Sequence, residues 1–341
     1  MATAAGTTAA RPSTSIDAVL LPIAVDAMGG DRAPGAIVTG ARRAAEELGL
    51  PVVLVGRAEE LGAGHGLEVI EASQAIAMDA DPANSVRTMK DSSLVRAAEA
   101  VRDGRASAMV SAGNTGATMA SALLRMGRIK GVNRPAIATP IPNPGSSPTV
   151  MLDAGANAEC QPEWLVQFAQ MGVVFAQERF SIAEPKVALL SIGEEDKKGT
   201  PLVKQANALL RAASLPKGAT FVGNVEGRDI MTSAVDVLVT DGFTGNVALK
   251  TLEGAMKALV DAILGHLGDA GVLEETMPHL LPLYAQLDPE STGGAMLLGV
   301  DGVCIISHGS SNDVAMLNAV KVAAEMVEHD LVAKLRAAIA L

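Results

Sequence analysis

The chain has 341 residues, 49% of them hydrophobic, and a mean hydropathy of +0.29, which excludes disorder as its main state. Its net charge of −11 opposes binding to a polyanion and its 2% aromatic content leaves few rings on which bases could stack, so we expect no nucleic-acid partner. The two cysteines, Cys160 and Cys304, indicate neither a metal-ligand spacing nor a disulfide framework, and no apolar run reaches the roughly 18 residues of a membrane-spanning helix.

The first segment of the chain is rich in Ala, Thr and Ser and has its first positive charge at Arg11. It contains no leucine run, so it does not match the pattern of a signal peptide. We predict a disordered tail over residues 1–20 and a single large α/β unit over residues 21–341.

From Leu20 onward, short β-branched runs alternate with helical patterns rich in Ala and Leu, which predicts an α/β/α layered fold with a mostly parallel sheet. The predicted strands are residues 23–26, 52–55, 68–71, 108–111, 136–140, 149–153, 186–191, 220–223, 235–240 and 302–307. The predicted helices are residues 35–48, 92–103, 115–126, 162–178, 201–213, 246–267 and 311–338.

A helical insertion is expected at about residues 255–291. Apolar residues from Met256 to Leu267 recur at helical spacing, and a second apolar set runs from Met277 to Leu287. Such faces suit dimer or core packing, or a hairpin that touches a membrane surface. Acidic residues outnumber the single Lys in this stretch, so any membrane contact has to be apolar and weak.

Seven predicted strands end in segments that combine Gly with small polar or acidic residues. Open α/β sheets bind ligands outside the carboxyl ends of their strands, and Gly there lets a ligand approach the backbone. One such loop alone is equally explained by turn and helix-cap chemistry, but seven together predict one crevice. The residues expected to form its walls are Asp26, Gly29, Gly30, Asp153, Asn157, Asn224, Asp241 and Thr244.

A phosphate site is expected where a strand leads through Gly and a hydroxyl residue into a helix, because free N–H groups at a helix N-terminus attract anions. The best candidate is the segment after the strand at residues 108–111. Its predicted phosphate-binding residues are Ser111, Asn114, Thr115 and Gly116.

Two side chains are the main candidates for chemistry. Lys198 lies in the only strand-end loop that contains lysines, and could hold a phosphate or a developing oxyanion; a solvated charge run is the alternative. His308 is the one His at a strand end among Gly and Ser, where capping or packing is the alternative role.

Several well-known catalytic motifs are missing from the sequence. It contains no P-loop, no Gly-x-Gly-x-x-Gly after a strand, no Gly-x-Ser-x-Gly elbow and no His-Glu-x-x-His. Nucleotide-binding and hydrolase functions are therefore disfavoured, and we expect neither a metal nor a cofactor.

Taken in order, the strand-end segments resemble the PlsX family of phosphate acyltransferases over about residues 23–335. The matching motifs are Asp26-Ala-Met-Gly-Gly-Asp31, Ser111-Ala-Gly-Asn-Thr-Gly-Ala117, Leu152-Asp-Ala-Gly-Ala-Asn157, Ile192-Gly-Glu-Glu195 with Lys198-Gly199, Gly223-Asn-Val-Glu226 and Thr240-Asp-Gly-Phe-Thr-Gly-Asn246. Thr292 departs from this family, which usually has Tyr before Gly-Gly-Ala.

This resemblance implies transfer of a fatty acyl group from acyl-[acyl carrier protein] to inorganic phosphate, giving acyl phosphate for phospholipid synthesis. It also implies a fold similar to phosphotransacetylases and isopropylmalate dehydrogenase-like proteins, a homodimer, and a cytoplasmic location with loose membrane association. A membrane glycerol-3-phosphate acyltransferase is a further implied partner.

The residue inventory suits this reaction, because phosphate is itself the nucleophile and a thiolate is a good leaving group. Lys198 is expected to bind phosphate or the oxyanion, and Asn246 and His308 to orient the thioester.

Other activities remain open: an acyl-CoA-dependent phosphotransacylase, a hydroxy-acid dehydrogenase, or a non-catalytic lipid-binding protein on the same fold. A dehydrogenase is disfavoured because the paired Asp metal cluster it would need is missing.

An acidic carrier protein needs a local positive surface on an enzyme of net charge −11. The segment after the helix at residues 115–126 has four cations and no acid, and the alternative role of its cations is to offset the helix dipole. The predicted docking residues are Arg125, Arg128, Lys130 and Arg134.

Overall fold

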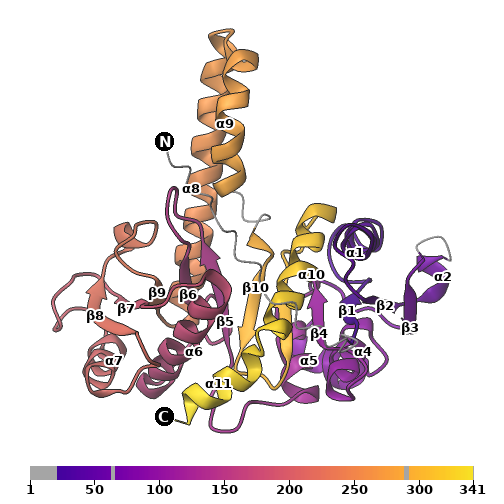
Figure 1. Cartoon of the computed structure of the whole chain (residues 1–341), viewed down its shortest axis with the longest axis horizontal. Helices are drawn as coiled ribbons and strands as arrows, with labels where there is room; N and C mark the ends of the chain where they lie inside the picture. Colours follow the sequence, from indigo (N-terminus) through magenta and orange to yellow (C-terminus); the bar gives the residue numbers. More distant parts are fainter. Residues whose placement is uncertain (1–20, 63–65, 288–291, 341) are drawn as a thin grey trace, which may run out of the picture.

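The computed structural model describes residues 21–62, 66–287 and 292–340, and these form one 11-stranded sheet with helices on both faces (Figure 1). The strands are β1 (Ile23–Asp26), β2 (Val52–Gly56), β3 (Glu68–Glu71), β4 (Ala108–Ser111), β5 (Ala136–Ile141), β6 (Thr149–Leu152), β7 (Lys186–Leu190), β8 (Thr220–Val225), β9 (Val237–Val239), β10 (Ala295–Leu298) and β11 (Val303–Ile306). The helices are α1 (Gly35–Leu48), α2 (Ala58–Leu61), α3 (Pro82–Thr88), α4 (Ser93–Arg102), α5 (Thr115–Arg125), α6 (Pro162–Phe180), α7 (Pro201–Ala212), the 3-10 turn η1 (Gly227–Asp229), α8 (Gly242–Asp269), α9 (Leu273–Leu287), α10 (Asp313–Glu328) and α11 (Leu331–Ile339). The tail predicted at residues 1–20 lies outside the described residues.

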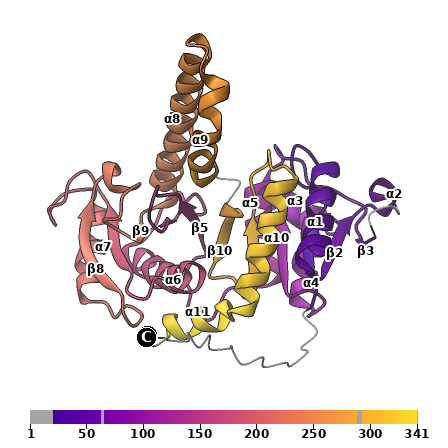
Figure 2. The same ribbon diagram turned by 45° about the horizontal axis from the view of Figure 1, so that its top comes forward.

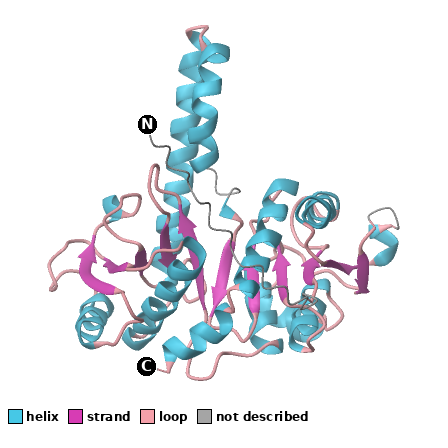
Figure 3. Ribbon diagram, in the orientation of Figure 1, coloured by secondary structure: helices cyan, strands magenta, loops and turns pink. Residues whose placement is uncertain are grey.

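The sheet consists of two parallel blocks joined by two central strands (Figure 3). Its order is β3-β2-β1-β4-β11-β10-β5-β6-β9-β7-β8, with β3, β2, β1, β4 and β11 parallel to one another. β10 is antiparallel to both β11 and β5, and β6 is antiparallel to β5 but parallel to β9. The prediction of a mostly parallel α/β sheet is confirmed.

Each face of the sheet has its own apolar core, because strand side chains alternate between the faces. Ile23 and Val25 pack with buried residues of α1, α6, α10 and α11, whereas Ala24 and Met109 pack with those of α4 and α5. Ala248, Leu249 and Leu252 at the start of α8 pack on this second side. The base of α8 is therefore fixed on the same face as α4 and α5.

Beyond its base, α8 leaves the sheet and pairs with α9 in a helical hairpin that projects from the body (Figure 2). Gly242 and Gly245 are the buried residues of α8, and α9 has none among its described residues. The hairpin covers most of the stretch where the insertion was predicted, and residues 288–291 lie outside the described chain. No helix in the described part of the chain is both long and apolar enough to span a bilayer.

Two differences from the predicted elements have clear causes. β10 was not predicted, because the apolar run from residue 295 to 306 turns back on itself at Gly299 (φ +92°), between β10 and β11, and so forms two strands. The single helix predicted at residues 311–338 is two helices, because Asp330 adopts a left-handed conformation (φ +51°) that ends the first.

Candidate active site

A cavity of about 680 Å³ lies between β5, the α8–α9 hairpin and the loops that follow β4 and β11. One face of α8 forms its longest wall, because the lining positions recur every three or four residues. These residues are Asn246, Leu249, Lys250, Leu252, Glu253, Met256, Lys257, Val260 and Asp261.

Beside the cavity, a buried carboxylate ties the loops after β1 and β4 together. The Oδ2 of Asp26 accepts a hydrogen bond from Ser111 Oγ at 2.7 Å, and its Oδ1 accepts one from the Met28 N–H at 3.3 Å. Burial raises the pKa of the Asp26 carboxyl, and these hydrogen bonds oppose that shift. A Cβ on Gly29 would lie 2.5 Å from Asp26 Oδ2 and 2.8 Å from the Gly113 nitrogen, so only Gly permits this packing.

The loop after β11 joins the same group. The Asp31 N–H donates to the Gly309 carbonyl at 2.8 Å, and the neighbouring Gly30 has φ +109°. A side chain at Gly30 would also approach the Gly309 carbonyl to 3.2 Å. Asp26, Gly29 and Gly30, which were predicted to form the walls, thus hold the cavity loops together but do not line the cavity.

Two helix N-termini open on the cavity. Asn114 caps α5 by accepting from the Ala117 N–H at 2.9 Å, and Asn312 caps α10 by accepting from the Ala315 N–H at 2.9 Å. Thr115 at the start of α5 lines the cavity, as do Ser310, Ser311 and Asn312 before α10. The first N–H groups of a helix lack intrahelical partners and carry its positive dipole end, so together these termini suit an anion.

The other predicted phosphate-binding residues support this arrangement. The Asn114 Nδ2 donates to the carbonyls of Met78 and Ala80 at 2.8 and 3.1 Å, and Gly116 lies against Pro82. Ser111, Asn114 and Gly116 are not among the described residues that line the cavity, whereas Thr115 is.

On the opposite side, a second buried carboxylate organises the loop after β6. Asp153 accepts hydrogen bonds from the N–H groups of Ile137, Gly155, Ala156 and Asn157 at 3.0, 3.1, 2.9 and 2.7 Å. It also accepts from Asn157 Nδ2 at 2.9 Å. Burial raises the pKa of Asp153, and the hydrogen bonds to it act in the opposite direction.

This loop interlocks with the start of α8. The Gly242 N–H donates to the Asn157 carbonyl at 2.8 Å, and Asn246 Nδ2 donates to the Ala154 carbonyl at 3.2 Å. Asp241 caps α8 by accepting from the Thr244 N–H at 2.9 Å and from its hydroxyl at 2.8 Å. Asn246 is thereby held at the base of the cavity wall, so Asp153, Asn157, Asp241 and Thr244 position it.

Lys250 and His308 face each other within the cavity. The Lys250 Nζ lies 3.5 Å from His308 Nε2 and 2.8 Å from Glu253 Oε2, and the other ring nitrogen of His308 lies 2.7 Å from Ser310 Oγ. Arg32 and Lys257 are further cations in the lining. His308 and Asn246, two of the three predicted catalytic residues, thus share one cavity.

The third, Lys198, does not reach this cavity. It lies exposed in the loop after β7, where its N–H donates to the Glu195 carbonyl at 2.9 Å. Asn224 belongs to this neighbouring group, donating to the Glu195 carbonyl at 2.9 Å and accepting from Asn207 Nδ2 at 2.9 Å. The predicted wall residues therefore form two separate groups rather than one crevice. The loops after β7 and β8 pack on each other at the edge of the sheet, on the far side of β9 from β6.

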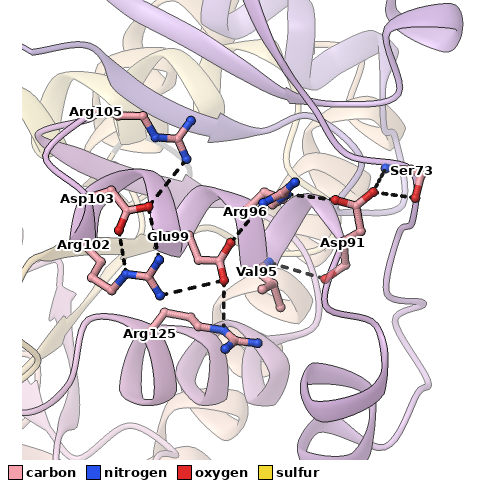
Figure 4. A network of polar contacts seen from close by, with 10 residues as sticks. Ser73, Asp91, Val95, Arg96, Glu99, Arg102, Asp103, Arg105 and Arg125 are labelled. Atoms are coloured by element: carbon pink, nitrogen blue, oxygen red, sulfur yellow. Dashed lines mark hydrogen bonds and ion pairs between the residues drawn. The ribbon is translucent and has the colours of Figure 1, made fainter.

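The predicted docking cations lie between the end of α5 and the start of β5, whereas the cavity extends along β5 from Ile137 to Pro142. Arg125 pairs with Glu99 at 3.6 Å within a network that includes Arg96 and Arg102 (Figure 4). Arg134 stacks 5.1 Å over the Trp164 ring, and Arg128 donates to the Asn133 carbonyl. Lys130 is exposed. None of these four lines the cavity in the described part of the chain.

Lys250, Glu253 and the apolar wall of α8 were not predicted as site residues. Their signal was present in the sequence, because Lys250 follows Asn246 by four residues and so lies on the same helix face. Thr292, noted in the sequence for its departure from the PlsX pattern, lines the cavity with Gly294 and Ala295.

Within the described residues, no group of three or more His, Cys, Asp or Glu side chains is placed to hold a metal ion.

The chain is similar to known proteins over most of its length. The family described as "Fatty acid synthesis protein" matches residues 21–334. The phosphate acyltransferase of Heliobacterium modesticaldum is 47% identical, covering 92% of this chain and 96% of that protein, and that of Elusimicrobium minutum is 47% identical over 93% and 96%.

Among solved structures, the fold is similar to a branched-chain phosphotransacylase from Enterococcus faecalis, with a TM-score of 0.60 at 16% identity over 90% of this chain and 99% of that one. A phosphotransacetylase from Streptococcus pyogenes also has a TM-score of 0.60 at 16% identity, over 89% of this chain and 94% of that one. The expected likeness to the phosphotransacetylase fold is confirmed.

Proposed function

The chain belongs to the phosphate acyltransferase family and is an acyltransferase, and from this premise we propose that it transfers a fatty acyl group from an acyl carrier protein to inorganic phosphate. The product is an acyl phosphate that supplies phospholipid synthesis. The observation that carries the proposal is a single cavity in which two helix N-termini, the cations Arg32, Lys250 and Lys257 and the acids Glu253 and Asp261 adjoin apolar side chains. One end suits phosphate and the other a fatty chain.

In the proposed reaction, phosphate binds at the N-termini of α5 and α10, near Thr115 and Ser310. A phosphate oxygen attacks the thioester carbonyl, the carbon–oxygen bond forms, the carbon–sulfur bond breaks, and the sulfur leaves as a thiolate that takes up a proton. No enzyme nucleophile is needed. Holding the two substrates together contributes up to roughly 7–11 kcal/mol of the barrier in well-oriented cases.

Negative charge develops on the thioester oxygen in the transition state, and the Lys250 ammonium is the cation best placed to stabilise it. It lies 3.5 Å from His308, and His308 and Asn246 line the same cavity, where they orient the thioester. One well-placed donor of this kind contributes roughly 2.7–4 kcal/mol. We assign this role to Lys250 in place of Lys198, because Lys198 lies outside the cavity of its own chain.

We propose that the α8–α9 hairpin forms the contact of a homodimer and also touches a membrane loosely. In this proposal the enzyme is cytoplasmic and delivers acyl phosphate to a membrane glycerol-3-phosphate acyltransferase. Exposed apolar side chains on the hairpin support the proposal: Leu259 is 62% exposed, Leu281 53% and Leu283 44%. Binding that depends strongly on anionic lipid in a vesicle flotation assay would contradict it, since an apolar contact requires no lipid charge.

Carrier-protein docking on Arg125, Arg128, Lys130 and Arg134 is likewise proposed. Because Arg125 pairs with Glu99, the cleaner variant is Arg128→Glu with Lys130→Glu. It should raise KM for the acyl carrier protein thioester while leaving KM for an acyl-CoA unchanged. An unchanged, salt-insensitive KM for the carrier substrate would remove this surface from the proposal.

The function itself is tested by trapping acyl phosphate as a hydroxamate. Reactions with acyl carrier protein thioester, with acyl-CoA and with no donor are compared, each with and without phosphate. We expect product that depends on phosphate and on the carrier donor. Equal or greater product from acyl-CoA would favour the phosphotransacylase alternative, and no product from either donor would favour a non-catalytic lipid-binding protein.

A further inference from the structure

The cavity continues past the proposed reaction centre as an apolar groove between β5 and the α8–α9 hairpin. On the α8 side, Leu252, Met256 and Val260 follow Lys250 along the lining face, alternating with the charged side chains Glu253, Lys257 and Asp261. Ile141 and Pro142 at the carboxyl end of β5, with Tyr284 and Leu287 of α9, complete the walls. Since Lys250 and His308 contact each other at one end of this groove, a thioester held there has apolar surface leading away from it.

We propose that this groove binds the fatty acyl chain of the donor, and that Val260, with Tyr284, sets the chain length that fits fully within it. This rests on the proposed function, because it places the acyl part of that substrate. The assigned ligand is a fatty acyl chain attached through a thioester near Lys250 and extending toward the tip of the hairpin.

The length of the groove follows from helix geometry. From Lys250 to Val260 is ten residues of α8, or about 15 Å at 1.5 Å per residue. A zigzag of carbon–carbon bonds of about 1.5 Å advances a little over 1 Å per bond, so roughly a dozen carbons cover this distance. A chain of eight carbons therefore ends before Val260, and a chain of sixteen has to pass it.

The groove differs from the faces of the hairpin that suit a second copy or a membrane. Leu259 and Ile263 are 62% and 42% exposed, and neither is among the described residues that line the cavity. Val260 is half-buried and lines it. Adjacent residues of α8 thus separate an inner face, which lines the cavity with Met256 and Val260 beside Lys257 and Asp261, from an outer apolar face that carries Leu259 and Ile263. The continuity of the inner face with the polar site is the reason to assign an acyl chain rather than a protein partner to it.

Val260→Trp and Leu259→Trp form a matched pair, because they place the same bulk on the inner and outer faces of one helix turn. The measurement is kcat/KM for acyl phosphate formation from carrier-protein thioesters of eight and sixteen carbons, using the full chain. We expect Val260→Trp to lower the sixteen-carbon value at least about tenfold and the eight-carbon value less than about twofold. Leu259→Trp should leave the ratio of the two values unchanged.

An unchanged ratio in Val260→Trp would overturn the proposal, as would an equal change in Leu259→Trp, which would indicate that a second copy covers this part of the hairpin. If the unmodified chain makes no acyl phosphate from either thioester, the proposed function fails and the groove is judged by equilibrium binding of hexadecanoate and octanoate. Selective loss of hexadecanoate binding in Val260→Trp would support the groove, and equal binding to both chains would overturn it.

Discussion

Two regions at strand ends have similar sequences and different organisation. Around the cavity, the carboxylates Asp26 and Asp153 are buried and accept hydrogen bonds that fix the surrounding loops. In the loop after β7, Asp196 and Glu194 are exposed and pair with the guanidinium groups of Arg211 in α7 and Arg228 in the turn after β8. Both regions contain Gly, acids and a nearby lysine.

The difference shows what a strand-end carboxylate can do. When it is buried against N–H groups, it sets backbone geometry, and the helix beginning at that loop then carries side chains to a fixed place. Lys250 is held in this way, one turn beyond Asn246. When the carboxylate is exposed, it offsets a cation on the surface and contributes little to stability.

The largest expected effect separates the two lysines. Lys250→Met should lower kcat/KM for acyl phosphate formation about 100-fold, because it removes the cation to which we assign stabilisation of the thioester oxygen. Lys198→Met, the matched variant in the other region, should change it less than about threefold, as exposed substitutions usually do. Unfolding temperatures should stay unchanged in both. A larger loss in Lys198→Met would show that this lysine acts at a cavity outside its own chain.

The second effect concerns stability rather than turnover. Asp153→Ala leaves the N–H groups of Ile137, Gly155, Ala156 and Asn157 without their acceptor, and should lower the free energy of unfolding by about 3 kcal/mol.

Asp241→Ala, which removes a helix cap and a hydrogen bond from the Thr244 hydroxyl, serves as the control for Asp153→Ala and should cost about 1 kcal/mol. Denaturant unfolding of the two variants measures the difference. Equal losses would mean that the buried carboxylate does not organise the second group of loops.

The smallest effect is expected at Cys160, which lies next to these loops but has no assigned role. Burial raises the pKa of its thiol to about 12. Because the thiolate is the reactive form, alkylation by iodoacetamide should be very slow at pH 8 and accelerate as the pH approaches that value. Cys160→Ala should keep turnover within about twofold. Rapid alkylation near neutral pH, with loss of activity, would contradict a purely packing role.

Much of the fold could be predicted because β-branched runs and helical periodicity are local signals. Strands such as residues 23–26 and 108–111 have the predicted bounds, and Gly after them marks loops that do approach one another. β10 could not be predicted in the same way, since its pairing with β5 and β11 depends on where the chain turns at Gly299.

The site was harder to predict than the fold, for a physical reason. Lys198 lies in a strand-end loop and Lys250 lies in the helix that follows one, but only the packing of α8 beside β5 brings Lys250 into a cavity with His308. Which strands are neighbours decides which loops meet, and that is a long-range property. The position of Arg128 and Lys130 before β5, away from the cavity, likewise follows from the direction of that strand.

The central claim is that phosphate and the thioester meet beside Lys250, and amine labelling with site-resolved mass spectrometry tests it most directly. The labelling rates of Lys250 and Lys198 are measured in one sample, with and without phosphate and a non-hydrolysable hexadecyl thioether of the carrier protein. We predict that these ligands slow the labelling of Lys250 and leave that of Lys198 unchanged. Protection of Lys198 with Lys250 still fully labelled would contradict the claim.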